Sequence, residues 1–427
     1  MAALAVVTYW RSLSLPFISD DYLQIWLARR YGPISGWHDL IRDPLYRCRA
    51  TSLLVTYWTE RWFGLTPRPF YWSSLILHVW DVWLVFALGI WRVIGWRKAA
   101  VAAAFFAVYE RHQEAVIWYA AQPELLVFFF GVLALLFWIL WVQSEGSNCW
   151  YAAGFWGAFL LALASKESAV AVLGLCLVIC WFGETDRRIR FSPRLLLPLG
   201  AAVALSAVYA ALIFVNQTHH WHFQDGTFSL HAPFYRTWAI SLTRMFWLWG
   251  LAATAILCHR SRLGDAAVGF AWAGIALFPY CFLTYMREVP SRHTYWASAG
   301  LALIVAAAFV ELYRTWGRSR CWLLYTVAAV MVTQNAGYIW TRKQQQFEER
   351  AAPTERLIQR ARSARGPVYL HSFPYPLPVA ESAVALEAGN RVIPIQADRL
   401  PPNAAAGSIL FYLPSGTHMP AFDVALR

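Results

Sequence analysis

Long runs of apolar residues recur along most of the chain, and short polar stretches separate them. A helix needs about 20 residues to cross a bilayer, and several of these runs are shorter than that. We therefore predict about 11 membrane spans, some of them partial or re-entrant. The expected spans are residues 2–18, 70–91, 99–109, 122–142, 150–164, 168–183, 195–215, 237–258, 266–285, 295–313 and 321–340.

The pattern changes after residue 340. The segment "TRKQQQFEERAAPTERLIQRARSAR" is typical of a charged helix. The segments "GPVYLHSF", "NRVIPIQ" and "GSILFYLP" are short, rich in strand-forming residues and bounded by Gly, Pro and Asn. We therefore expect an all-α polytopic membrane protein in two units: a transmembrane domain at 1–340 and a small extracytoplasmic α/β domain at 341–427.

The first expected span is short, and an unusually apolar loop follows it. The opening "MAALAVVTYW" lacks the basic region and cleavage site of a signal peptide, and it is short for a span, which is consistent with a start that clips the first helix. The loop that follows, residues 19–69, is basic and aromatic but too apolar to be a free loop. We expect one or two helices lying in the membrane interface there.

Composition supports the same class of protein. Hydrophobic residues make up 59% of the chain and charged residues only 14%, and the 25 tryptophans are typical of interfacial belts. The net charge of +12 is interpreted as cytoplasmic retention charge, not as a nucleic-acid surface. The seven cysteines are scattered without a CxxC pair, which predicts core residues and neither a metal site nor a disulfide framework.

Charge also orients the chain. Four short connections, "RVIGWRK", "DRRIRFSPR", "HRSRLG" and "YRTWGRSR", are basic and fall on one side if every expected span crosses. Positive charge marks the cytoplasmic side of a membrane. This places the sequence "SDDY" at 19–22 and the C-terminal unit on the extracytoplasmic side. We expect the protein to lie in the plasma or inner membrane of a cell.

The "SDDY" stretch carries two adjacent carboxylates, Asp20 and Asp21, at the outer mouth of the first span. One interpretation is a helix N-cap provided by Ser19 or Asp20. The other is a general base fixed at a helix start beside a membrane cavity. The two roles are compatible, and the sequence leaves both open.

Other charged residues are expected on the same outer face. They are Arg47 in the first loop, Glu110, Glu114 and Glu124 in the second, Lys166 and Glu167 at a helix boundary, and Arg287, Arg292, His293 and Tyr295 before the tenth span. Arginines that face lipid headgroups are one interpretation, and a site for an anionic phosphate is the other. Arg292 and Tyr295 are equally open to an ordinary interfacial role. The gathering of acids and bases on one face predicts an extracytoplasmic site.

Inside the second span, His78 and Asp81 share a helix face at i,i+3. Intramembrane Asp is rare and normally faces a bundle interior. We predict a buried His–Asp hydrogen bond that locks two helices, with a proton relay as the alternative.

Five segments in order resemble one family. They are "SDDY", "RATSLLVTYWTERWFGLTPRPFYWSSLILH", "HQEAVIWYAAQPELL", "LASKESAV" and "SRHTYWASAGLAL", spread over roughly residues 10–310. Together they resemble the GT-C polytopic membrane glycosyltransferases, which use polyprenyl-phosphate sugars, in particular the protein O-mannosyltransferase and four-amino-arabinose transferase group. The usual Arg-Pro of loop one is replaced by "YRCRATS", so Arg47 or Arg49 is the counterpart only by position.

The resemblance implies a transferase that moves a sugar from a polyprenyl-phosphate carrier to the hydroxyl of an extracytoplasmic glycan, lipid or protein. Asp20 is then the base, and Asp21 orients it or helps to bind the acceptor, although the order could be reversed. Glu114 becomes an acceptor-side candidate. Arg292, followed by Lys166 and Arg47, becomes the phosphate ligand, and Tyr295 a hydrogen-bond donor to the phosphate.

No cofactor is predicted. Some relatives use a divalent metal between two acidic loops, and Asp20, Asp21 and Glu114 could bind Mg²⁺ or Mn²⁺ only if those loops converge. The rival functions are a proton-coupled transporter or lipid flippase, in which His78 and Asp81 would carry protons, a ligase or polymerase of surface glycans, and an inactive scaffold. The acids cluster outside and no inverted repeat is evident, which disfavours a transporter.

Overall fold

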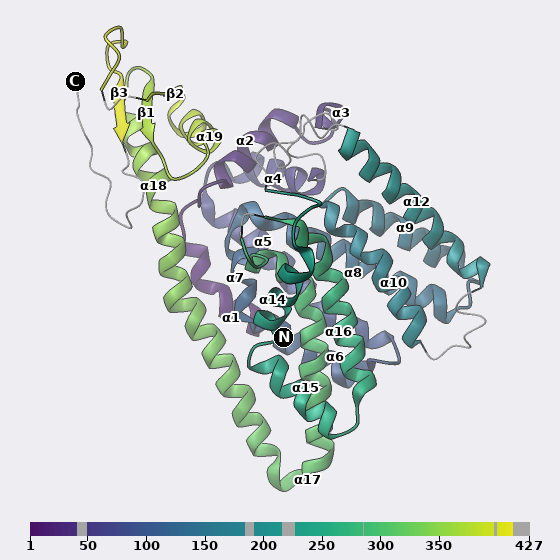
Figure 1. Cartoon of the computed structure of the whole chain (residues 1–427). Helices are drawn as coiled ribbons and strands as arrows, with labels where there is room; N and C mark the ends of the chain where they lie inside the picture. The colour runs from purple at the N-terminus through teal and green to yellow at the C-terminus, as the bar shows by residue number, and fades with distance from the viewer. Residues whose placement is uncertain (41–48, 184–191, 216–226, 285, 397–398, 413–427) are drawn as a thin grey trace.

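The computed structural model describes residues 1–40, 49–183, 192–215, 227–284, 286–396 and 399–412. Helices dominate it, and a three-stranded sheet lies near the C-terminus (Figure 1). The helices of the first half are α1 (Ala2–Tyr9), α2 (Asp21–Tyr31), α3 (Trp37–Leu40), α4 (Ala50–Phe63), α5 (Pro67–Ala87), α6 (Gly95–Val108), α7 (Gln113–Ile117), α8 (Gln122–Gln143), α9 (Cys149–Leu163) and α10 (Ala171–Phe182). Those of the second half are α12 (Pro193–Val215), α14 (Phe234–Phe246), α15 (Trp249–His259), α16 (Leu263–Leu277), α17 (Ala297–Tyr338), α18 (Gln344–Ser363) and α19 (Leu377–Ala388).

Short helical turns join these helices. The 3₁₀ turns are Trp10–Ser14, Leu88–Ile90, Glu110–His112, Tyr119–Ala121, Glu167–Val170, Phe278–Phe282 and Ser291–Thr294, and a π-helical segment covers Ile339–Lys343. Every segment expected to span the membrane is largely helical, as predicted.

The number of crossings is a separate matter. Among the described residues, five helices are long and apolar enough to cross a membrane, and a sixth is reached if α14 and α15, bent by 84°, count as one. The five are Pro67–Ile90, Tyr119–Gln143, Leu195–Leu212, Leu263–Phe282 and Ala297–Trp316. Large apolar side chains on these helices remain exposed, such as Trp80 at 57% and Val208 at 58%, as a lipid-facing surface requires. The protein is an integral membrane protein, but a count of 11 spans is not confirmed.

Residues 313–320, expected to be a connection between two spans, are helical, because α17 is one helix of 42 residues. In Figure 1 it turns sharply at the lower end of the molecule, so that one part packs beside α16 and the other returns upward toward α18. Gly300 and Gly269 allow the first part to approach α16, because a Cβ on Gly300 would lie 2.3 Å from the Gly269 carbonyl oxygen.

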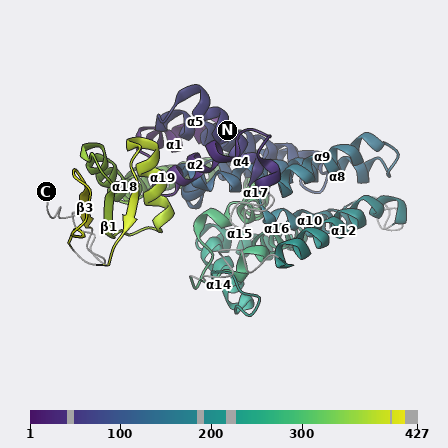
Figure 2. The same cartoon turned by 90° about the horizontal axis from the view of Figure 1, so that it is seen from above.

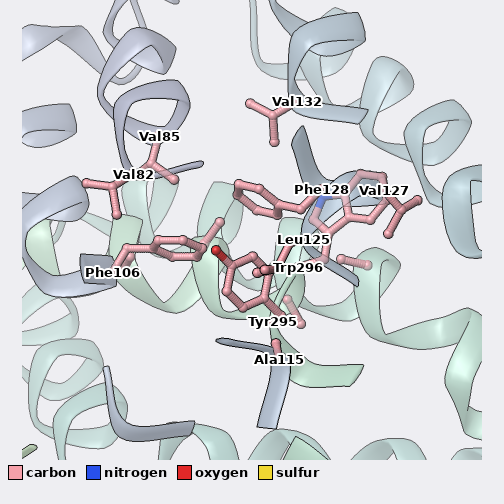
Figure 3. Close-up of a cluster of buried hydrophobic side chains, with 14 of the residues drawn as sticks. Val82, Val85, Phe106, Ala115, Leu125, Val127, Phe128, Val132, Tyr295 and Trp296 are labelled. Atoms are coloured by element: carbon pink, nitrogen blue, oxygen red, sulfur yellow. The ribbon is translucent and has the colours of Figure 1, made fainter. Parts of the chain in front are cut away.

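The helices pack around one continuous apolar core. Figure 3 shows Phe106 of α6 and Phe128 of α8 against Tyr295, with ring centroids 5.1 and 5.2 Å from the Tyr295 ring. Seen from above, α1, α5, α8 and α9 lie on one side of α17, and α10, α12 and α16 lie on the other (Figure 2). This arrangement brings the Ser291–Thr294 turn, just before α17, against α7 (Gln113–Ile117).

The C-terminal unit contains the three predicted strands. They are β1 (Val368–Ser372), β2 (Val392–Pro394) and β3 (Ile409–Tyr412), all parallel in the order β2-β1-β3. Helices α18 and α19 bury Leu357 and Val384 against this sheet. The unit is not isolated, since Val379 of α19 packs with Leu23 and Leu27 of α2, and the helical path from α17 crosses residue 340 without a loop.

Candidate active site

The "SDDY" turn gives its two carboxylates different surroundings. Ser19 has φ of +50°, a conformation that non-glycine residues seldom adopt and that tends to be kept where function needs it. Asp20 is the N-cap of α2 by position, but its side chain makes no capping hydrogen bond and instead accepts one from the Ser19 hydroxyl. The capping interpretation is therefore wrong for this side chain. Asp20 stays partly exposed, whereas Asp21 is completely buried.

Asp21 ties three segments together. Its Oδ2 accepts from the Ile18 N–H at 2.8 Å and from the Tyr71 hydroxyl at 3.2 Å, and its Oδ1 accepts from the Ala120 N–H at 2.8 Å. Burial raises the pKa of Asp21 to about 7, although the N–H donors oppose this. A pKa near 7 suits a base, but both oxygens are already engaged and none of the side chain reaches solvent. The geometry gives Asp21 the orienting role.

Glu114 and Arg292 do meet, as the outer-face prediction required. The backbone N–H of Arg292 donates to Glu114 Oε2 at 3.2 Å, and the guanidinium Nη1 of Arg292 lies 3.7 Å from the same oxygen. Sequence reasoning missed two neighbours of this pair, Trp118 and Arg350. Arg350 Nη1 lies 3.9 Å from Glu114 Oε1, and its guanidinium lies over the Trp118 ring. Trp118 belongs to the quoted loop-two motif, whereas nothing local marks Arg350.

Lys166 lies in a different cluster. Its ammonium donates to Glu124, which also accepts from His293 and, at 2.6 Å, from the Tyr280 hydroxyl. Burial lowers the pKa of Lys166, while Glu124 pulls it upward. Burial and then the Lys166 charge lower the pKa of His293 to about 3. Lys166 is only 5% exposed, so the structure presents it as half of a buried ion pair and not as an open phosphate ligand.

Tyr295 is buried in the apolar core of the protein. Its hydroxyl donates to Asp81 Oδ2 at 2.9 Å and lies 2.7 Å from His78 Nδ1. The predicted direct hydrogen bond between His78 and Asp81 is thus replaced by one through Tyr295, which joins α5 to the segment before α17. A helix-locking group is present as predicted, and its third member is Tyr295, which the family resemblance implies as a phosphate ligand. The Tyr295 hydroxyl is engaged in this group, and the residue is only 1% exposed.

The remaining predictions concern Arg47 and a metal. Arg47 lies outside the described residues. Within the described ranges, no group of three or more His, Cys, Asp or Glu could hold a metal ion. Two of the three candidate carboxylates do not fit one either, because the oxygens of Asp21 accept N–H and O–H donors and those of Glu114 face two guanidiniums. No step is therefore assigned to a metal.

Comparison with known proteins supports the fold. No protein-family model matches the chain, and no curated protein matches its sequence significantly. Among solved structures, ArnT from Cupriavidus metallidurans bound to undecaprenyl phosphate has a TM-score of 0.62 at 14% identity, over 93% of this chain and 85% of that one. AglB, the oligosaccharyltransferase of Archaeoglobus fulgidus in complex with an inhibitory peptide and a dolichol-phosphate, has a TM-score of 0.56 at 12% identity, over 92% of this chain and 64% of that one.

A third match is the Archaeoglobus fulgidus oligosaccharyltransferase in complex with Zn and sulfate, with a TM-score of 0.55 at 14% identity, over 92% of this chain and 62% of that one. All three are GT-C enzymes, so the chain has the GT-C fold that the five sequence segments predicted. At these identities the match defines the fold alone.

Proposed function

We propose that this protein is a membrane glycosyltransferase that moves a sugar from a polyprenyl-phosphate carrier to an acceptor hydroxyl. The observation that carries the proposal is the asymmetry of the "SDDY" turn on a GT-C fold, where Asp20 is partly exposed and not used for capping while Asp21 is buried and fully engaged. The ArnT structure is bound to undecaprenyl phosphate and the AglB structure is in complex with a dolichol-phosphate, which supports a lipid-phosphate donor for this chain.

In the proposed reaction, an Asp20 carboxylate oxygen takes the proton of the acceptor hydroxyl. The acceptor oxygen attacks the anomeric carbon, and the bond between that carbon and the phosphate oxygen breaks. The polyprenyl phosphate leaves as an anion and is the second product. The carboxylate charge also favours the oxocarbenium-like transition state.

Arg292 is the proposed partner of the phosphate. Its side chain is about one quarter exposed, and its guanidinium lies near Glu114 and against the Trp118 ring. A phosphate that leaves with its negative charge needs cationic stabilisation more than a proton. In this proposal Glu114, which contacts Arg292, acts on the donor side, whereas the family resemblance alone implies an acceptor-side role.

The finer topology is also part of the proposal. Eleven segments cross or enter the membrane, the site and the C-terminal unit face the extracytoplasmic side, and residues 1–340 and 341–427 are the two domains. The "SDDY" turn and the C-terminal unit lie at the same end of the molecule, which supports their common side (Figure 1).

The test is transfer from a panel of radiolabelled polyprenyl-phosphate sugars in membranes that contain the protein. Movement of label into a glycan, lipid or protein, together with release of polyprenyl phosphate, is the expected result. Transfer from nucleotide sugars but from no lipid-linked donor would contradict the proposal. So would proton-coupled movement of the lipid across the membrane without loss of its sugar, which would indicate a flippase.

The Tyr295 hydroxyl should affect stability and not the donor. Tyr295→Phe is expected to lower the free energy of unfolding by about 1–3 kcal/mol, because it leaves Asp81 buried without its donor. The apparent KM for the donor should stay unchanged. Chemical unfolding in mixed micelles measures the first quantity, and the exposed Tyr338→Phe serves as the control. A stable variant with a raised KM would return Tyr295 to the phosphate site.

A further inference from the structure

Two guanidiniums lie against one tryptophan ring. The Arg350 Cζ atom is 4.3 Å from the Trp118 ring centroid, and the Arg292 Cζ atom is 5.0 Å from it. The Trp118 side chain is almost completely buried at the end of α7, so the ring is a fixed platform. Cations within about 6 Å of a ring face are attracted to it, more strongly when they are partly desolvated.

The Glu114 carboxylate lies against both arginines. Its Oε2 faces Arg292 at 3.7 Å, and its Oε1 faces Arg350 at 3.9 Å. Both distances exceed the roughly 2.7–2.9 Å of a charge-assisted hydrogen bond, so each guanidinium forms a long ion pair with this carboxylate. The group of three carries two positive charges and one negative charge, with each side chain only 23–27% exposed. Two guanidiniums against one ring can both donate to a single anion.

The C-terminal unit positions one of the two arginines. Arg350 belongs to α18, and the Tyr375 hydroxyl, from the segment between β1 and α19, donates to the Arg350 carbonyl oxygen at 2.6 Å. Tyr375 also packs against the apolar cluster that includes Leu27 of α2, directly after the "SDDY" turn. The C-terminal unit therefore packs against α2 and brings Arg350 of α18 to Glu114 and Trp118.

We propose that Arg350 and Arg292 form a two-arginine clamp on Trp118 that binds the phosphate group of the lipid-linked donor and of the product. The inference rests on the proposed function and adds a residue from the C-terminal unit to its site. Each guanidinium presents a planar fork of N–H donors that matches phosphate oxygens. Glu114 offsets part of the repulsion between the two guanidiniums when no phosphate is present.

Binding of undecaprenyl phosphate to the purified full-length protein in detergent, measured by native mass spectrometry, tests the clamp without requiring turnover. Arg350→Gln and Arg292→Gln should each weaken binding by about tenfold, the usual effect of losing a hydrogen bond to a charged group. The double variant should lose less than the product of the two, because both arginines hold one phosphate. Arg342→Gln removes an exposed arginine just before α18 and should change nothing.

Controls separate the outcomes. Undecaprenol has the same lipid chain without phosphate and should bind equally to all variants, and inorganic phosphate should compete only weakly if the lipid anion is the ligand. Arg350→Lys keeps the charge and should recover part of the affinity if Arg350→Gln fails to fold. Loss of affinity in Arg292→Gln with wild-type affinity in Arg350→Gln and Arg350→Lys would overturn the clamp and leave the proposed function intact. Wild-type protein that binds undecaprenyl phosphate no better than undecaprenol would overturn both.

Discussion

Replacing Asp20 by Asn should lower the turnover number for sugar transfer by about 10²–10⁴-fold, the range that a general base contributes. The substitution keeps the size and the partial exposure of the side chain, and Asp20 makes no capping hydrogen bond that the helix would lose. The thermal stability of the variant should therefore match that of wild type. Transfer assays at saturating donor, paired with melting curves in detergent, measure both quantities.

The adjacent carboxylate provides the internal comparison. Asp21→Asn places an amide N–H₂ group where one oxygen now accepts a buried N–H, from either Ile18 or Ala120. The thermal stability of this variant should therefore be lower than that of wild type and of Asp20→Asn. Asp39→Asn, an exposed acid of the same loop with 61% of its side chain accessible, is the matched control. Full turnover in Asp20→Asn together with a stable and inactive Asp21→Asn would exchange the two roles.

Replacing Lys166 by Met should lower the free energy of unfolding by about 3–5 kcal/mol, since it leaves Glu124 buried without its cation. The effect is large because both side chains are almost completely buried: only 4% of the Glu124 side chain and 7% of the Lys166 side chain are exposed. Lys98→Met is the control, because the Lys98–Asp265 pair has side chains that are 23% and 28% exposed and should contribute less than about 1 kcal/mol. Chemical unfolding in mixed micelles compares them.

Removing both partners distinguishes a structural pair from a phosphate ligand. The double variant Lys166→Met with Glu124→Gln should recover part of the lost stability, because no uncompensated charge remains buried. A Lys166→Met protein that is as stable as wild type but binds undecaprenyl phosphate poorly would show that Lys166 holds the phosphate after all.

Local pattern was sufficient for much of this fold. The apolar runs located the helices, and Gly, Pro and Asn located the three strands, because both signals depend on neighbouring residues. Spacing also placed His78 and Asp81 on one helix face. It could not supply the hydroxyl that joins them, since Tyr295 is 217 residues from His78.

The candidate site shows the same limit. Asp20 and Asp21 are adjacent and chemically identical in the sequence, and only the φ of +50° at Ser19 and the donors from distant segments make one exposed and the other buried. Arg350 lies in a stretch with the composition of a solvent-exposed charged helix. Its contact with Trp118 depends on the return of α17 along the molecule, which no local pattern encodes.

The π-helical segment Ile339–Lys343 sets the rotational phase of everything beyond it. A π-helical turn contains one residue more than an α-helical turn, and each residue of a regular helix contributes about 100° of rotation and 1.5 Å of rise. Removing a single residue here would turn Arg350 about a quarter of the way around the axis and away from Trp118, without changing any side chain of the site. The length of this segment is thus as specific a determinant of the clamp as the arginine itself.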